Sequence, residues 1–99
     1  MKKREQIISK KQIKQQRNDL MSALAQLTDP ADIEAFLLDL CTSAEIEAMV
    51  DRLAVVPHLA QGRSYRAIHR LTGVSVTTIG RVAHAMLEGQ GGYAKVVPL

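Results

Sequence analysis

The sequence predicts an all-α fold, and three observations support this prediction. Apolar residues recur at three- and four-residue spacing along most of the chain, which is the period of an amphipathic helix. Aromatic residues make up only 3% of the 99 residues and tryptophan is absent, so the core must be built from aliphatic side chains and methionine. Residues that cap helix N-termini precede the apolar stretches. We therefore expect one small helical domain.

The first predicted helix covers residues 2–27, or is a shorter helix that a basic arm leads into. Ile13, Leu20 and Leu24 share one face of it, and a Thr-Asp-Pro sequence follows its end. Residues 1–17 contain seven Lys or Arg and a single acid. Two interpretations of this basic N-terminal arm remain open, an arm that wraps DNA and a solubilising tail.

Two further helices follow. Asp29 is an N-cap with Pro30 at the first helical position, and the helix that they begin should end near Cys41. Thr42 and Glu45 form a capping box, in which each side chain accepts a hydrogen bond from the backbone N–H of the other residue.

The helix that begins at this capping box has an unusually broad apolar face and should extend to Gln61. Pro57 removes one backbone hydrogen bond, so we expect a kink or a local break there. The apolar face is too large for a helix on the surface of a monomer. This helix is therefore the candidate for the central packing helix of a dimer.

Residues 64–87 have the pattern of a helix-turn-helix, two short helices joined by a tight turn that contains glycine. Ser64 and Ser75 are the predicted N-caps. Gly73 closes the first helix, because glycine adopts a left-handed backbone at little cost. The predicted buried stripes are Ile68 and Leu71 on the first helix, and Ile79, Val82 and Met86 on the second.

The outward face of this segment indicates contact with a polyanion. Small hydroxyl side chains at the start of the second helix can enter a major groove, and arginines can bond guanine or neutralise phosphate. Residues 63–87 contain no acid. The alternative is that two short helices meet at a glycine in any helical domain and that the charges are only solvated. The candidate DNA-binding residues from this pattern are Arg66, Arg70, Ser75, Thr77, Thr78 and Arg81.

The charge distribution divides the chain into basic, acidic and basic parts, although its net charge is only +3. Residues 18–62 carry eight acids and one base, whereas residues 63–99 carry five bases and one acid. Proteins that bind nucleic acid often segregate charge in this way. We predict a dimerisation and DNA-binding domain at residues 18–88, followed by a glycine-rich tail at residues 89–99. Three glycines in four positions should end the long-range order, and residues 94–97 should form a last turn or lie against a partner.

Several classes of protein are disfavoured. A single cysteine, Cys41, excludes an intramolecular disulfide and a cysteine-rich metal site. The histidines have no zinc-ligand spacing within one helix, although one exposed histidine beside a backbone phosphate would fit this surface. The sequence contains no nucleophile motif, phosphate-binding glycine loop, signal peptide or apolar run of ~20 residues. We predict a cytoplasmic protein with no enzymatic activity, cofactor, metal or membrane contact.

From Phe36 to Leu87 the sequence resembles the Trp repressor superfamily, and in particular its short YerC/YecD-type branch. The segments that carry the resemblance are F-L-L-D-L-C-T-S-A-E-I-E-A-M-V-D-R-L-A-V-V, L-A-Q-G-R-S-Y-R-A-I and L-T-G-V-S-V-T-T-I-G-R-V. They occur in order at matching spacing, which is far more specific than a lone helix-turn-helix.

The resemblance implies an intertwined all-helical homodimer whose paired helix-turn-helix units enter successive major grooves. A palindromic operator with half-sites ~34 Å apart would follow. The DNA-contacting positions of the family fall on Ser64, Arg66, Thr77 and Thr78. The expected function is that of a sequence-specific, repressor-type transcriptional regulator that binds double-stranded DNA. A helical adaptor that binds a protein partner and a ligand-dependent DNA-binding sensor are the alternatives.

The resemblance also implies a pocket for a small corepressor. The pocket positions fall on Thr42, Arg52 and Arg81, but Val82 replaces a glycine and Ala85 replaces the serine that receives the ligand's amino group. An unpaired charged amino group in a partly buried site costs at least ~1–3 kcal/mol, which argues against L-tryptophan. Binding of another ligand, pairing with Asp39 or Asp51 and, for Arg81, phosphate contact remain as alternatives.

Overall fold

The computed structural model describes residues 7–99, which contain helices and turns but no strand. The predicted all-α class is therefore confirmed over that range. The chain forms two compact units, residues 1–40 and residues 41–99. The first contains α2 (Lys10–Ala25) and α3 (Pro30–Leu40).

Helix α2 begins later than the sequence pattern predicted. Ser9 is its N-cap, since the Ser9 hydroxyl accepts from the Gln12 backbone N–H at 3.1 Å and the Gln12 side chain accepts from the Ser9 N–H at 2.8 Å. This capping box fixes the start at Lys10, and residues 8 and 9 are not helical. The alternative of one continuous helix over residues 2–27 is therefore wrong, while its part at residues 2–6 lies outside the described residues.

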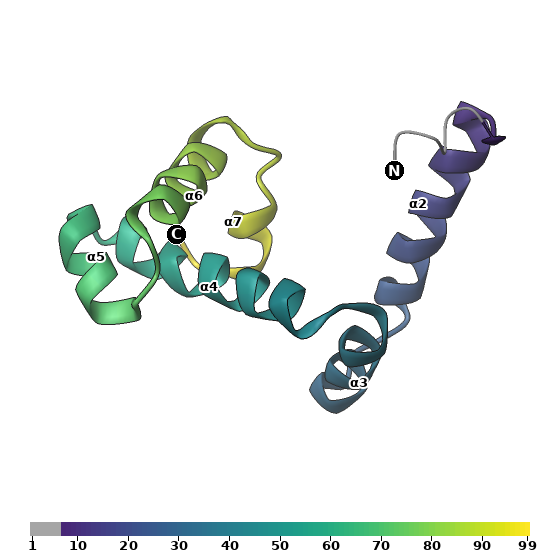
Figure 1. Cartoon of the computed structure of the whole chain (residues 1–99), viewed down its shortest axis with the longest axis horizontal. Helices are drawn as coiled ribbons and strands as arrows, with labels where there is room; N and C mark the ends of the chain where they lie inside the picture. The colour runs from purple at the N-terminus through teal and green to yellow at the C-terminus, as the bar shows by residue number, and fades with distance from the viewer. Residues whose placement is uncertain (1–6) are drawn as a thin grey trace. The chain divides into compact units, whose positions relative to one another are not determined.

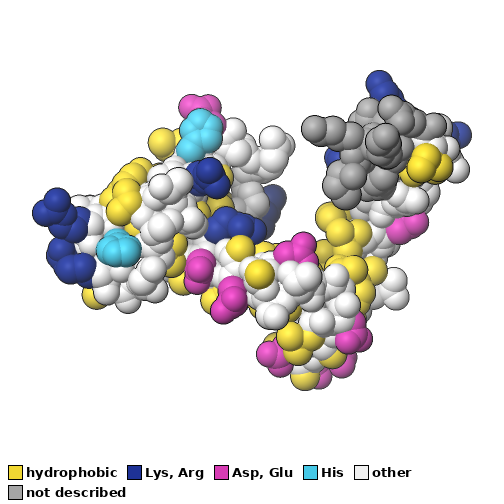
Figure 2. Space-filling view, in the orientation of Figure 1, with side chains coloured by type: hydrophobic (Ala, Val, Ile, Leu, Met, Phe, Trp, Pro, Cys, Tyr) yellow, Lys and Arg dark blue, Asp and Glu magenta, His cyan; other side chains and the backbone are white. Residues whose placement is uncertain are grey.

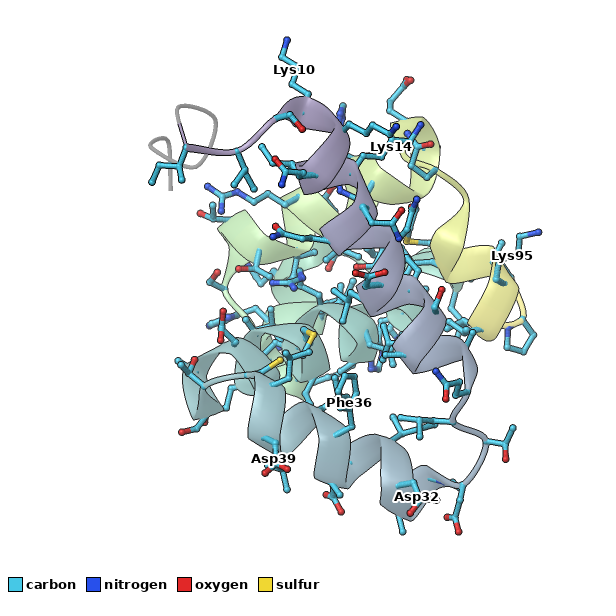
Figure 3. The ribbon with its side chains drawn as sticks, turned by 90° about the vertical axis from the view of Figure 1, so that its right-hand side faces the viewer. Lys10, Lys14, Asp32, Phe36, Asp39 and Lys95 are labelled. Carbon is cyan, nitrogen blue, oxygen red and sulfur yellow. The ribbon has the colours of Figure 1, made fainter. Side chains whose placement is uncertain are left out.

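Helix α3 begins as predicted. The Asp29 carboxylate accepts from the Ala31 backbone N–H at 2.9 Å, and Pro30 is the first helical residue. Figure 3 shows Asp32 and Asp39 on this helix, and Lys10 and Lys14 extending from α2. Neither helix contains a buried residue. The first unit thus has no buried core of its own among its described residues.

The second unit is built on α4 (Ser43–Ala60), which carries α5 (Tyr65–Thr72), α6 (Val76–Glu88) and α7 (Gly92–Val96), as Figure 1 shows. The predicted capping box of α4 is confirmed, with hydrogen bonds of 2.7 and 3.1 Å between Thr42 and Glu45. The expected local break at Pro57 is wrong, because α4 continues through it to Ala60. Pro57 lies in the last turn, directly after Val55 and Val56, which are fully buried and hold the helix in place.

The core of the second unit lies between α4, α5 and α6. The predicted stripe of α6 is confirmed, since Ile79 and Val82 are 0% and 1% exposed and Met86 packs against them. Leu71 was predicted to share the buried face of Ile68, but it is 62% exposed. Val74 from the following turn occupies the core instead. The buried residues are Val55, Val56, Ile68, Val74, Ile79 and Val82.

The expectation that the three glycines end the long-range order is wrong, because the chain continues into a further short helix that packs against the core. Gly91 has a positive φ of 75° that turns the chain into the short helix α7. Tyr93 and Val97 then pack against the core, while Lys95 extends away from α7 in Figure 3. The last turn that the sequence allowed is therefore present, and two of its apolar side chains add to the core.

Candidate nucleic-acid interface

Local hydrogen bonds set the two ends of α5. The Ser64 hydroxyl accepts from the Ala67 backbone N–H at 3.1 Å, which confirms the predicted N-cap. Gly73 has a φ of 76°, and its N–H donates to the His69 carbonyl at 2.8 Å. The left-handed glycine therefore ends α5 where the sequence predicted.

Two side chains that the sequence did not single out hold the turn between α5 and α6. The Thr72 hydroxyl donates to the Ile68 carbonyl at 2.7 Å and accepts from the Val74 backbone N–H at 3.1 Å. His69 Nδ1 lies 2.8 Å from the Val74 carbonyl oxygen. For the Thr72 contacts, the signal available in the sequence was a hydroxyl residue directly before Gly73, the glycine that ends α5. Together they fix the direction in which the chain enters α6.

Helix α6 begins with an N-cap that engages two of the candidate DNA-binding residues. The Ser75 hydroxyl accepts from the Thr78 backbone N–H at 3.2 Å and donates to the Thr78 hydroxyl at 3.1 Å. Thr78 is half-buried, whereas Thr77 is exposed and has no side-chain hydrogen bond within residues 7–99. Of the candidate hydroxyls at the start of α6, that of Thr77 is the one with no hydrogen bond to another described residue.

The candidate arginines lie on the surface around these helices. Arg66 and Arg70 on α5 and Arg81 on α6 are exposed, and none forms an ion pair with any described residue. Figure 2 shows Lys and Arg side chains gathered over α5. Residues 63–87 contain no carboxylate, so no acid within this segment neutralises these cations.

An aromatic ring at the start of α5 lies beside a glycine of α6. A Cβ atom built on Gly80 would lie 3.8 Å from Cε2 of Tyr65, so the ring covers the Gly80 backbone. Tyr65 itself remains 41% exposed. The 3.8 Å distance is an ordinary van der Waals contact, so an alanine at position 80 would also fit against the ring beside the candidate interface.

The structure spreads the candidate ligand-binding residues along the second unit. Arg52 and Arg81 are exposed on α4 and α6, which pack against each other, and neither pairs with Asp51. Thr42 is the N-cap of α4, ten positions before Arg52, which corresponds to ~15 Å of helix.

Two hydrogen bonds from Thr42 lower the pKa of the Glu45 carboxyl. The backbone N–H of Thr42 has the larger effect and its side chain the smaller one.

A largely apolar cavity of about 370 Å³ lies at the junction of α4, α6 and α7. Ala85, one of the positions at which the resemblance places a pocket, is among its lining residues, but neither arginine is. Its lining residues are Leu53, Ala85, Gly89, Gln90, Gly92, Tyr93 and Val96.

Two other kinds of site have no support in the described part of the chain. No group of three or more His, Cys, Asp or Glu side chains there could hold a metal ion. No helix there is both long enough and apolar enough to cross a membrane.

Comparison with known proteins gives a consistent result. A family profile described as "Trp repressor protein" matches residues 15–98. A protein of Bacillus subtilis (strain 168), described as "Uncharacterized protein YerC", is 34% identical over 76 residues, which cover 77% of this chain and 73% of that protein.

Crystal structures with the same fold also exist. That of a TrpR-like protein from Eubacterium eligens ATCC 27750 has a TM-score of 0.78 and 34% identity, and the match covers 83% of this chain and 84% of the other. A second structure, from Staphylococcus aureus, has a TM-score of 0.75 and 32% identity, with 80% and 79% of the two chains covered.

Proposed function

Because this chain belongs to the Trp repressor family, in its YerC-type branch, we propose that it is a sequence-specific DNA-binding transcriptional regulator. The α5–turn–α6 segment would act as a helix-turn-helix, and a homodimer would present two of them. The observation that carries the proposal is the exposed Thr77 hydroxyl on the first turn of α6, one helical turn before the exposed Arg81 and within a segment, residues 63–87, that contains no acid.

The proposal divides the candidate residues into two roles. Thr77 reads base edges in the major groove, because its hydroxyl is not used within the chain. Ser75 and Thr78 fix the start of α6 through their mutual hydrogen bonds, and they contact DNA only at the edge of the interface. Phosphate contacts, which give most of the affinity and fix the register, come from Ser64, Arg66, Arg70 and Arg81.

Exposed apolar surface supports the homodimer. The first unit has no buried residue in its two helices, and on α4 Val50 and Leu53 are 60% and 46% exposed. A chain of this size cannot leave so much apolar surface in water at little cost. A second copy that covers these faces would place the two α6 helices on a palindromic operator with half-sites ~34 Å apart.

Tryptophan is not the corepressor that we propose. Val82 is 1% exposed, so its branched side chain occupies the space of the glycine that the resemblance places there. Ala85 offers no polar atom to an amino group, and it lines a mostly apolar cavity. Repression of transcription is part of the proposal. A corepressor of this chain would have to be a molecule other than an amino acid zwitterion.

The test is a selection of bound duplexes from a random DNA pool, followed by fluorescence anisotropy with the selected site and with random DNA. We expect Thr77→Ala to weaken binding to the selected site by about tenfold more than binding to random DNA, since one good base contact contributes ~1–3 kcal/mol of discrimination. Arg66→Ala removes a phosphate contact and should weaken binding to both DNAs alike. Lys95→Ala, on α7, is the matched control and should change neither affinity. Equal losses of affinity for the two DNAs in Thr77→Ala would contradict base readout by Thr77.

The alternative of a protein-binding adaptor is separated by the same assay. A DNA-binding regulator must show saturable binding that weakens as salt is raised, because phosphate contacts release counterions. An adaptor whose exposed apolar faces bind another protein would show no saturable, salt-dependent binding to any duplex in the pool.

A further inference from the structure

The ring of His69 is held at one nitrogen by a backbone carbonyl. Its Nδ1 lies 2.8 Å from the Val74 carbonyl oxygen, inside the turn between α5 and α6. A carbonyl oxygen only accepts, so Nδ1 must carry the hydrogen and donate. This assignment holds for the neutral ring and for the protonated ring alike, and it leaves Nε2 as the nitrogen that gains or loses a proton.

His69 shares the outer side of α5 with the two candidate arginines. Arg66 lies three residues before it and Arg70 directly after it, and all three side chains are exposed. Ile68, which is fully buried, lies about 160° around the helix from Arg66 and about 100° from His69. His69 therefore belongs to the surface that the proposed function presses against phosphate.

The charged groups around α5 do not bind His69. Helices α4 and α6 pack against α5, and within residues 7–99 the only polar partner of His69 is the Val74 carbonyl. Arg63 in the preceding link pairs with His58 instead, at 2.9 Å. The charged or titratable groups of the two packed helices are Glu45, Glu47, Asp51, Arg52 and His58 on α4, and Arg81, His84 and Glu88 on α6.

We propose that His69 is a further phosphate-contacting residue of the DNA interface and that DNA binding takes up a proton at its Nε2. The inference rests on the proposed DNA-binding function. In the neutral ring Nε2 offers a lone pair, which faces a phosphate oxygen with like polarity. In the protonated ring it donates a charge-assisted hydrogen bond to that oxygen. The proton comes from solvent when the complex forms and returns there on release.

The hydrogen bond to Val74 makes this titration a change of charge and not of fold. Nδ1 donates to the carbonyl in both protonation states, so the turn into α6 is the same above and below the titration. DNA affinity should then rise as pH falls through the range in which imidazole becomes charged, while the position of α6 is unchanged.

The test compares wild type with His69→Asn, whose amide N–H can replace the Nδ1 donor but cannot titrate. The probe is a fluorescent mixed-sequence duplex of ~30 base pairs, because phosphate contacts do not depend on sequence. Between about pH 8 and about pH 6, at fixed ionic strength, wild type should gain about tenfold more affinity than the variant. At the acid pH its salt slope should also be steeper by about 0.9 for each phosphate contact, and at the alkaline pH the slopes should agree.

His84→Asn, an exposed histidine on α6, is the matched control and should retain the wild-type pH response. If His69→Asn lowers the melting temperature, His69→Lys replaces it and should bind more tightly than wild type at about pH 8. Equal pH and salt responses of wild type and His69→Asn, or no gain from His69→Lys, would overturn the inference. A wild type that binds no duplex at either pH would instead overturn the proposed function.

Discussion

The left-handed backbone of Gly73 gives a prediction whose size follows from the structure. Gly73 has a φ of 76°, and a Cβ added there meets nothing within 4 Å, so Gly73→Ala introduces backbone strain without a clash. A left-handed alanine costs ~1–2 kcal/mol. The lower entropy of the unfolded chain returns ~0.4–1 kcal/mol. We expect a net loss of about 1 kcal/mol.

Gly92→Ala is the matched control for this substitution. A Cβ at Gly92 also meets nothing within 4 Å, but Gly92 has no positive φ and is the first residue of α7. Only the unfolded-state term and helix propensity then act, so we expect a gain of up to ~1 kcal/mol. The two substitutions should therefore change stability in opposite directions.

The assay is thermal unfolding followed by circular dichroism at one fixed protein concentration, since association would shift the transition. A loss of 1 kcal/mol lowers the melting temperature of a domain of this size by ~4–8 °C. Gly73→Asn should lose less than Gly73→Ala, because asparagine tolerates the left-handed region. If the alanine variants of Gly73 and Gly92 shift the transition in the same direction and by the same amount, the sign of φ is not the cause and the reasoning fails.

Three further predictions concern the core, the capping box and the arm. Ile79→Val should cost ~0.5–1.5 kcal/mol in urea unfolding because Ile79 is fully buried, whereas the larger truncation Leu71→Ala at a 62% exposed site should stay within ~0.5 kcal/mol; equal costs would contradict the core assignment. Thr42→Ala should lose ~1 kcal/mol with its cap. The Thr42 N–H lowers the pKa of the Glu45 carboxyl, so the ionised carboxylate stabilises the fold. Wild type should therefore have a higher urea midpoint than Glu45→Gln at pH values above the ordinary Glu pKa, and this difference should vanish as pH falls through the lowered folded-state pKa. A difference that does not change with pH would refute the role of the hydrogen bond. Deletion of residues 2–8 should reduce the salt slope of DNA binding by ~0.9 for each phosphate that the arm neutralises and leave the melting temperature unchanged, and an unaltered slope would show that the arm does not touch DNA.

Helix ends were the features most readily predicted from the sequence. The N-caps at Thr42, Ser64 and Ser75 and the left-handed Gly73 are all confirmed, because each depends on residues within four positions along the chain. The Ser9 cap has the same kind of signal, a serine with Gln12 three residues later. A local rule therefore existed for the true start of α2, although a helix over residues 2–27 was one of the two interpretations of this region.

Burial was predicted less well, because it depends on neighbours that are distant in sequence. Leu71 has the spacing of a core residue, yet Val74 from the turn occupies that part of the core. Pro57 is unfavourable in an isolated helix, but buried neighbours keep α4 continuous through it. The same limit hid the His69 contact, since a ring and a carbonyl five residues apart meet only when the turn is folded.

The hydrogen bonds around the turn distinguish side chains that stabilise the fold of the interface from side chains that could bind the bases of DNA. Thr72 and His69 bond to the backbone on the α5 side, and Ser75 and Thr78 bond to each other on the α6 side. A side chain that satisfies the fold gives up part of its capacity to bond a base, and replacing it disturbs the helix direction as well. The Thr77 side chain makes no hydrogen bond within the described residues, so its substitution should change the affinity for DNA without moving α6. Comparison of Thr77→Ala with Ser75→Ala by melting temperature and by binding would show this difference, and a Thr77→Ala variant as destabilised as Ser75→Ala would show that Thr77 too serves the fold.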